Sequence, residues 1–273
     1  MQNYKKKVII FGINSMIGKN IANFLVKDGA EVFGTYRNKN SEINKLDKNI
    51  KILKCDLTKI NDLKKLRKKL LSLKFKWDLI FFSVGTTKPI GPFFSTSFQD
   101  WAKSFNTNFL CQISALHQIF NIKKNENSSI CFLAGTGTNG TMDSYSAYTI
   151  SKIALIKFCE LISSEYPKLK IFIIGPGLTR TRSHLETLQA KKKAGKNYLK
   201  IKKFWKSKKQ GTPFKKIYDC LNWAWSEKKN IISGRNFSVV FDKWGNKNLS
   251  KLLLQNKDYY KLRRLGNNIK IKK

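Results

Sequence analysis

The chain has 273 residues, with 54 Lys and Arg against 17 Asp and Glu, and a formal net charge of +37. A chain of this length can fold around one large core, and we expect a single domain over residues 1–273. It has no run of about 18 apolar residues, so we expect no transmembrane helix; the apolar run ending at Gly12 is too short for a signal peptide. The five scattered cysteines form no Cys-x-x-Cys pair and there are only two histidines, which argues against a metal site and favours a reducing, cytoplasmic setting.

The positive charge has two interpretations. It could serve a polyanionic partner, such as nucleic acid or an anionic membrane. Most of the cations are Lys, however, and they are spread along the chain beside many Asn and Ile residues, as in proteins from AT-rich genomes. Dedicated phosphate and base readers favour Arg. We therefore expect no specific nucleic-acid partner and no membrane partner, although the charge should attract anionic substrates and cofactors.

The N-terminal stretch has the pattern of a strand, a glycine turn, a helix and a second strand. The first strand is expected at 5–11 and the second at 31–36, and Gly12 and Gly18 lie in the turn between the first strand and the helix. Such a unit delivers a pyrophosphate to the helix N-terminus, so the pattern predicts dinucleotide binding. Met16 stands where the usual pattern has its middle glycine, which leaves an ordinary strand-to-helix turn as the alternative.

The end of the second strand indicates which dinucleotide. NAD-binding units commonly place an acid there for the ribose 2′-hydroxyl, whereas this chain has Arg37 and no acid. A guanidinium suits a 2′-phosphate, so we expect NADP(H) rather than NAD(H). The alternative is a solvated arginine after a strand.

The remaining chain alternates strands with helices. Strands are expected at 50–54, 79–83, 130–133 and 170–174, and helices at 59–73, 98–120 and 214–227. This alternation predicts an α/β fold, a single-domain Rossmann fold with a doubly wound parallel sheet and helices on both faces. Ligands bind such sheets at the carboxyl ends of the strands, where Asp56, Gly85, Gly135 and Pro176 are expected. Asn108, in the middle of a helix, is unfavourable by propensity and would line a site only if it is buried.

Tyr148 and Lys152 follow the fifth strand on an expected helix, four residues apart and so on one face. A neighbouring cation should lower the pKa of the tyrosine, which could then exchange a proton with a substrate. The same spacing also occurs at Tyr166/Lys170 and Tyr198/Lys202. Neither of these pairs follows a strand, so we favour the first pair.

The C-terminal third breaks the alternation. The lysine-rich segment 182–210 is expected to form one or two helices over the site as a substrate lid, with a disordered basic loop as the alternative. His184 in this segment either shapes the substrate site or is solvated. A last strand is expected at 232–241, followed by a C-terminal tail at 242–273 that packs on the domain or on a second subunit.

Several of these residues form an ordered set. The set comprises Gly12 and Gly18, Asp56-Leu57, Ser83-Val84-Gly85, Asn108, Tyr148 with Lys152, and Pro176-Gly177 with Thr181. In order and spacing it resembles the short-chain dehydrogenase/reductase family over residues 6–182. A narrower likeness, in the sequence around Tyr148, at 195–198 and at 233–244, is to a branch found among surface-polysaccharide genes.

The resemblance implies roles for individual residues. Tyr148 would be the general acid for carbonyl reduction or the base in reverse, Lys152 would lower its pKa and hold the nicotinamide ribose, and Asn108 would order a water relay. Asp56 would meet the adenine, and Thr181 the nicotinamide amide. The full set of expected cofactor contacts is Gly12, Asn14, Ser15, Ile17, Gly18, Arg37, Asp56, Leu57, Gly85, Pro176, Gly177 and Thr181.

Two positions depart from the family pattern. The substrate-orienting serine expected thirteen residues before Tyr148 is replaced by Gly135, with Thr136 as the nearest substitute. Losing such a hydrogen-bond donor typically costs about 10²–10³ in rate. Met16 would crowd the phosphate turn.

The sequence therefore favours an NADP(H)-dependent oxidoreductase that interconverts a hydroxyl and a carbonyl group of a small molecule, for example a sugar or nucleotide sugar. The alternatives are a dinucleotide-binding homologue that has lost catalysis and, from charge alone, a nucleic-acid binder. The family resemblance implies a homodimer or homotetramer.

Overall fold

The structure is a computed structural model that describes residues 5–208 and 211–264. Within these residues, seven strands form one sheet in the order β3-β2-β1-β4-β5-β6-β7, and all neighbours are parallel. The strands are β1 (Lys7–Phe11), β2 (Glu31–Tyr36), β3 (Lys51–Lys54), β4 (Leu79–Phe82), β5 (Ser129–Leu133), β6 (Lys170–Gly175) and β7 (Asn236–Ser238). The order reverses between β1 and β4, and doubly wound sheets bind ligands at such a reversal. The predicted fold class is confirmed.

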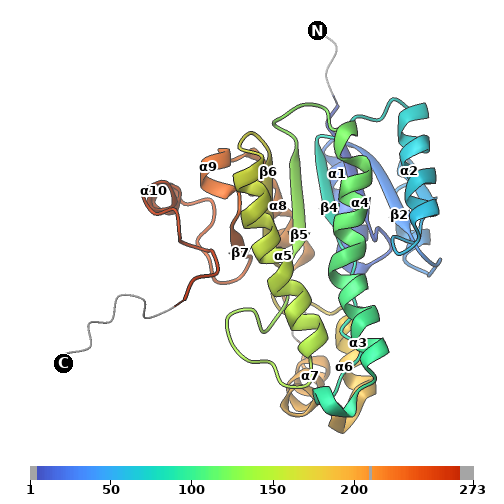
Figure 1. The fold of residues 1–273 in the computed structure, drawn as a ribbon, viewed down its shortest axis with the longest axis vertical. Coiled ribbons are helices and arrows are strands. Elements are labelled where there is room, and N and C mark those ends of the chain that lie inside the picture. The colour runs from blue at the N-terminus through green and yellow to red at the C-terminus, as the bar shows by residue number, and fades with distance from the viewer. Residues whose placement is uncertain (1–4, 209–210, 265–273) are drawn as a thin grey trace.

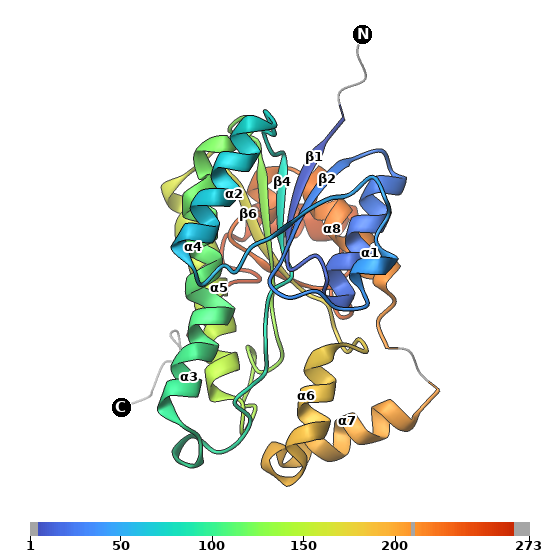
Figure 2. The same ribbon diagram turned by 90° about the vertical axis from the view of Figure 1, so that its right-hand side faces the viewer.

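Helices cover both faces of this sheet. They are α1 (Met16–Lys27), α2 (Ile60–Ser72), α3 (Phe98–Phe105), α4 (Cys111–Ile119), α5 (Ser146–Glu165), α6 (Arg182–Ala190), α7 (Lys196–Lys206), α8 (Phe214–Ser226), α9 (Lys229–Ile232) and α10 (Lys247–Gln255). Figure 2 shows α1 and α8 on one face and α2, α4 and α5 on the other. Three layers result, with a hydrophobic core on each side of the sheet.

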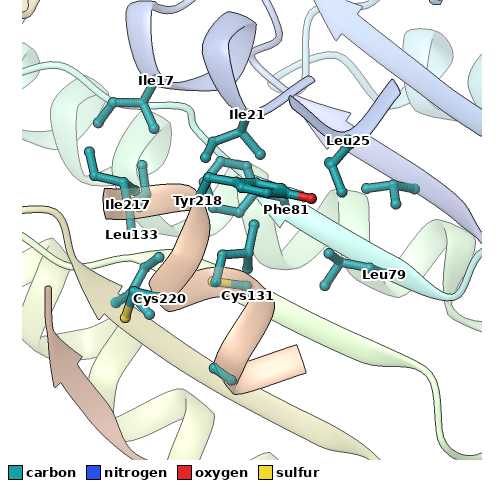
Figure 3. Close-up of a cluster of buried hydrophobic side chains, with 14 of the residues drawn as sticks. Ile17, Ile21, Leu25, Leu79, Phe81, Cys131, Leu133, Ile217, Tyr218 and Cys220 are labelled. Carbon is teal, nitrogen blue, oxygen red and sulfur yellow. The ribbon is translucent and has the colours of Figure 1, made fainter. Parts of the chain in front are cut away.

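The core under α1 and α8 shows why these segments fold as they do. Ile17, Ile21 and Leu25 recur at helical spacing on α1 and turn toward the sheet (Figure 3). They meet strand residues such as Phe81 and Leu133. Because each fully buried side chain of this size stabilises the fold by about 1.5–3 kcal/mol, this core fixes the helix that follows the glycine turn.

The expected long helix at 98–120 is present but interrupted. Between α3 and α4 the chain makes a π-helical turn at Asn106–Leu110. The turn carries Asn108, whose side chain is fully buried and bonded to the loop that follows β4. Isolated π-helical turns are frequent at functional sites.

The last strand is shorter than predicted. Of residues 232–241, only Asn236–Ser238 pairs with β6, whereas Ile232 ends helix α9. Gly234 has φ +75°, which breaks extended structure before the strand. After the strand, the Asp242 carboxylate accepts a hydrogen bond from Ser238 N (2.6 Å), which turns the chain away from the sheet.

The segment expected at 182–210 contains two helices. α6 and α7 lie beyond the carboxyl edge of the sheet (Figures 1 and 2), and residues 209 and 210 lie outside the described residues. The predicted tail at 242–273 contains α10, and its residues 265–273 also lie outside them. Buried Arg235 donates hydrogen bonds to Leu253 O (2.7 Å) and Asn256 O (3.1 Å), which fixes the end of α10.

Candidate functional site

A cavity of about 1610 Å³ lies along the carboxyl edge of the sheet. Loops that follow β1 to β6, together with α6 and α7, form its walls. The predicted residues found in the wall are Gly12, Asn14, Ser15, Ile17, Arg37, Asp56, Leu57, Gly85, Thr136, Tyr148, Lys152, Pro176, Gly177, Thr181 and His184. Folding therefore brings together residues from both halves of the chain.

The glycine turn between β1 and α1 is packed too tightly for side chains. Gly12 has φ +75°, and a Cβ atom there would lie 2.8 Å from Ser83 O. A Cβ atom at Gly18 would lie 2.5 Å from Gly12 O, so Gly18 supports the turn from beneath. Ser15 caps α1 by accepting a hydrogen bond from Gly18 N (2.9 Å). A helix N-terminus presented by such a turn suits the phosphates of a dinucleotide.

The far side of the turn is tied to the loop after β2. Asn14 donates a hydrogen bond to Asn38 O (2.7 Å). Arg37, in this loop, is exposed and faces the cavity. Met16, the departure from the glycine pattern, also lies in the cavity wall.

Asp56 and Leu57 form the next part of the wall, after β3. The Asp56 carboxylate accepts hydrogen bonds from Thr58 N (3.1 Å) and Thr58 Oγ1 (2.8 Å), which hold this loop in place. Leu57 is buried, and its apolar side chain gives the wall a surface suited to a planar ring.

Tyr148 and Lys152 lie one turn apart on α5, as the spacing predicts. Lys152 Nζ is 5.8 Å from the centre of the tyrosine ring and donates a hydrogen bond to Leu133 O (2.9 Å). Burial lowers the pKa of Lys152 to about 8. Burial, together with the negative charge of Glu186, raises the pKa of Tyr148 to about 12. Burial and the charge of Glu186 thus oppose the lowering of the tyrosine pKa that the spacing predicts.

Asn108 holds the loop after β4. Its Oδ1 accepts a hydrogen bond from Thr86 N (2.9 Å), and its Nδ2 donates to Thr86 O (2.9 Å). A Cβ atom at Gly85 would lie 3.1 Å from Asn108 Oδ1 and 3.9 Å from Lys152 Nζ. Gly85 thus occupies the narrow space between the asparagine and the lysine.

Gly135 stands where the family pattern has a serine, and its surroundings explain the difference. A Cβ atom there would lie 2.3 Å from the Tyr148 hydroxyl oxygen. The tyrosine hydroxyl therefore occupies the space that a serine side chain would need. Thr136 is exposed, and its hydroxyl lies 3.0 Å from Met142 Sδ.

The loop after β6 completes the wall. Gly177 has φ +76°, and a Cβ atom there would lie within 2.5 Å of Val240 and Thr212 side-chain atoms. Thr181 immediately precedes α6. His184 on α6 packs near the ring of Phe204, at 5.7 Å between centres, and burial lowers its pKa.

Glu186 is the residue that sequence reasoning missed. It is 4% exposed, lies in the cavity wall, and accepts hydrogen bonds from Thr86 and Thr87. The available signal was its isolation, because it is the only acidic residue between Glu165 and Asp219. A lone acid in a lysine-rich segment is a candidate for a specific contact.

Metal and membrane features were searched over residues 5–208 and 211–264. There, no group of three or more His, Cys, Asp or Glu residues is placed to hold a metal ion. None of the helices in that part of the chain is long and apolar enough to cross a membrane.

Comparisons with known proteins agree on the type of protein. A family model described as enoyl-(acyl carrier protein) reductase matches residues 12–239. An uncharacterised oxidoreductase of Saccharomyces cerevisiae is 24% identical over 183 residues, which cover 64% of this chain and 71% of that protein.

Solved structures show the same fold. The crystal structure of a short-chain dehydrogenase/reductase from Saccharomyces cerevisiae has a TM-score of 0.76 at 19% identity and covers 90% of this chain and 98% of that chain. The aldohexose dehydrogenase of Thermoplasma acidophilum has a TM-score of 0.72 at 19% identity, covering 86% and 92%. A variant of ElxO with NADPH bound has a TM-score of 0.71 at 21% identity, covering 86% and 97%. The chain therefore belongs to the short-chain dehydrogenase/reductase family and is an oxidoreductase of that family.

Proposed function

We propose that the protein is an NADP(H)-dependent oxidoreductase that interconverts a hydroxyl and a carbonyl group, with Tyr148 as the proton donor or acceptor. The observation that carries the proposal is the position of the Tyr148 hydroxyl, which lies over Gly135 on the cofactor edge of the sheet beside buried Lys152. A phenol placed in this way can transfer a proton to a carbonyl oxygen.

The remaining roles follow from this position. The dinucleotide, when bound, supplies the hydride chemistry. Lys152 favours the phenolate that proton transfer leaves behind, since it is the cation of the pair. Asn108 keeps the loop after β4 beside Lys152, and we propose that it helps to order a water relay. Thr136 directly follows Gly135 in the chain and carries a hydroxyl, and we propose it as the second substrate contact.

The turn of Gly12 and Gly18 fits a pyrophosphate, because side chains are excluded there and a capped helix begins beside it. We propose that Asn14, Ser15 and Ile17 of this turn and Asp56, Leu57 and Gly85 of the next two loops also contact the cofactor, with Pro176, Gly177 and Thr181 at its nicotinamide end. Arg37 favours NADP(H). A related structure, the ElxO variant, carries NADPH.

For the substrate, we propose a small polar molecule such as a sugar or nucleotide sugar, with His184 in its binding site. One structure of the same fold is named an aldohexose dehydrogenase, which makes sugars a reasonable first panel, alongside substrates from surface-polysaccharide synthesis. The lid would be 182–210, the segment whose helices α6 and α7 contribute to the cavity wall. Turnover of a panel of sugars and nucleotide sugars with NADPH and NADP⁺ tests this assignment.

We also propose a homodimer or homotetramer in the cytoplasm. Large apolar side chains are exposed on adjacent helices: Phe98 (66%), Leu110 (45%), Ile150 (46%) and Leu161 (51%). Exposed apolar side chains grouped on one surface are typical of protein interfaces. Light scattering after size exclusion tests the assembly, and a monomer at micromolar concentration would contradict it.

Exchange of Tyr148 for Phe tests the proposed function. This change removes only the hydroxyl, so turnover should fall by about 10²–10⁴-fold while cofactor affinity stays nearly constant. Steady-state rates measure the turnover, and a fluorescence titration with NADPH measures the cofactor affinity. Tyr166→Phe is the matched control, because it alters another tyrosine of the Tyr-x-x-x-Lys spacing that is half-exposed at the end of α5. Retained turnover in Tyr148→Phe would show that another group is the acid. If the wild type turned over none of the substrates tested, the result would favour a dinucleotide-binding homologue that has lost catalysis.

A further inference from the structure

Glu186 is a buried carboxylate in a segment otherwise dominated by lysine. It is 4% exposed and accepts hydrogen bonds from Thr87 N (2.7 Å) and Thr87 Oγ1 (2.7 Å), and from Thr86 Oγ1 (3.1 Å). Arg182 Nε lies 3.5 Å from the carboxylate, but the Arg182 side chain is 81% exposed and contributes little. A buried charge is stable only when it is well bonded, and here the bonds come from a different part of the fold.

These bonds connect helix α6 to the loop after β4. Thr86 is held on its backbone by Asn108 and on its side chain by Glu186. The residue before it, Gly85, lies between Asn108 and Lys152. One continuous set of contacts thus runs from α6 to the buried lysine of α5.

A second contact fixes the same helix to the start of α5. Tyr145 is fully buried and shares a hydrogen bond of 2.9 Å between its hydroxyl and Thr187 Oγ1 on α6. Tyr145 directly precedes α5, which carries Tyr148 and Lys152. α6 is therefore hydrogen-bonded both to the loop after β4 and to the residue that precedes α5.

We propose that Glu186 is a positioning residue: its carboxylate latches α6 onto the loop after β4, and it thereby fixes the wall of the cavity in which the substrate binds. The first part stands on the hydrogen bonds alone. The second part rests on the function proposed above, because it concerns the binding of the substrate.

Glu186→Gln tests both parts. The amide keeps the size of the side chain, but it removes the charge and turns an NH₂ group toward the donors of Thr86 and Thr87. We expect backbone hydrogen exchange in residues 182–206 to become at least about tenfold faster, because hydrogen bonds to a charged group are lost. We also expect KM for the substrate to rise by a larger factor than kcat falls.

Thr87→Val tests the latch from its other end. It removes one hydroxyl donor to Glu186, so exchange in 182–206 should speed up. Thr87→Ser keeps the hydroxyl and should restore slow exchange. Gln189→Ala, at an exposed position on the same helix, is the control that should leave exchange and KM unchanged.

The exchange measurement requires no substrate. Unchanged exchange in both Glu186→Gln and Thr87→Val would overturn the latch, whether or not turnover is found. A KM that does not rise in Glu186→Gln would overturn the effect on substrate binding. A wild-type protein without turnover would sink the proposed function, and the effect on substrate binding with it, while the latch would still be judged by exchange.

Discussion

At the scale of single residues, Gly135 determines where the Tyr148 hydroxyl can lie. The tyrosine oxygen would come within 2.3 Å of a Cβ atom at this position, so a serine at 135 and Tyr148 in its present place exclude each other. The departure from the family pattern is thus coupled to the placement of the tyrosine. The absence of a serine at position 135 was the observation that most favoured a homologue without catalysis, and the placement of the tyrosine explains this absence.

Arg37 tests cofactor choice at the same scale. Arg37→Ala should weaken NADPH binding by about 10–100-fold, because a charge-assisted hydrogen bond to a phosphate contributes about 1.5–3 kcal/mol. NADH lacks the 2′-phosphate, so its affinity should hardly change. Fluorescence titrations with both nucleotides measure the difference. Arg67→Ala, on the basic helix α2, controls for the loss of one positive charge, and an equal loss for both nucleotides in Arg37→Ala would refute the assignment.

At the scale of elements, the sequence predicted the six longer strands, the glycine turn and the helix of Tyr148 and Lys152. Those elements could be predicted because each follows from the pattern of apolar residues within a short stretch of the sequence. The isolation of Glu186 among lysines was visible in the sequence, but its contacts could not be predicted, because its partners Thr86 and Thr87 lie about 100 residues away in the chain. The raised pKa of Tyr148 was missed for a similar reason: the spacing reveals the neighbouring lysine but not the surroundings that the fold places around the tyrosine.

The sequence pattern also did not predict the π-helical turn at Asn106–Leu110. The role of Asn108, which lies in this turn, can be tested. Asn108→Ala would leave the N–H and C=O groups of Thr86 without the partners they have now. Each unsatisfied group costs about 1–3 kcal/mol when buried, so the free energy of unfolding should fall by about 2–4 kcal/mol and kcat should fall with it. Urea unfolding and steady-state rates measure both.

Asn106→Ala is the matched control for this prediction, because Asn106 lies in the same turn and is only partly buried. If both variants lose the same stability and activity, the effect belongs to the turn and not to the bonds of Asn108.

At the scale of the whole molecule, the C-terminal segment is attached to the helix that carries Tyr148 and Lys152, the proposed catalytic pair. Arg263 donates hydrogen bonds to Glu160 on α5 at 2.6 Å and 3.1 Å, across 103 residues of sequence. Asp258 also contacts Arg263, at 2.8 Å. Figure 1 shows α10 and the chain that follows it on the side of the sheet formed by β6 and β7. Arg263, near the end of the described residues, is therefore bound directly to α5.

This attachment makes stability depend on pH in a defined window. Burial opposes ionisation of Glu160, but hydrogen bonds from Arg263 and Lys157 outweigh burial and lower its pKa from 4.5 to about 2. Because the folded-state pKa is depressed, the ionised pair contributes its full stability above about pH 4.5. It loses that contribution as the pH falls toward 2. The partners are partly exposed, so we expect only about 1–2 kcal/mol.

Glu160→Gln should therefore unfold more easily than the wild type in urea at pH 6, and the difference should shrink as the pH falls toward 3. Comparing the two proteins at each pH isolates Glu160, because the other carboxylates titrate in both. Asp100→Asn is the matched control, since Asp100 forms an exposed ion pair with Lys103 (3.3 Å) and its removal should change the unfolding free energy little at any pH. A difference between wild type and Glu160→Gln that stays constant from pH 6 to pH 3 would mean that Glu160 acts through packing, and that Arg263 does not hold the C-terminal segment by charge.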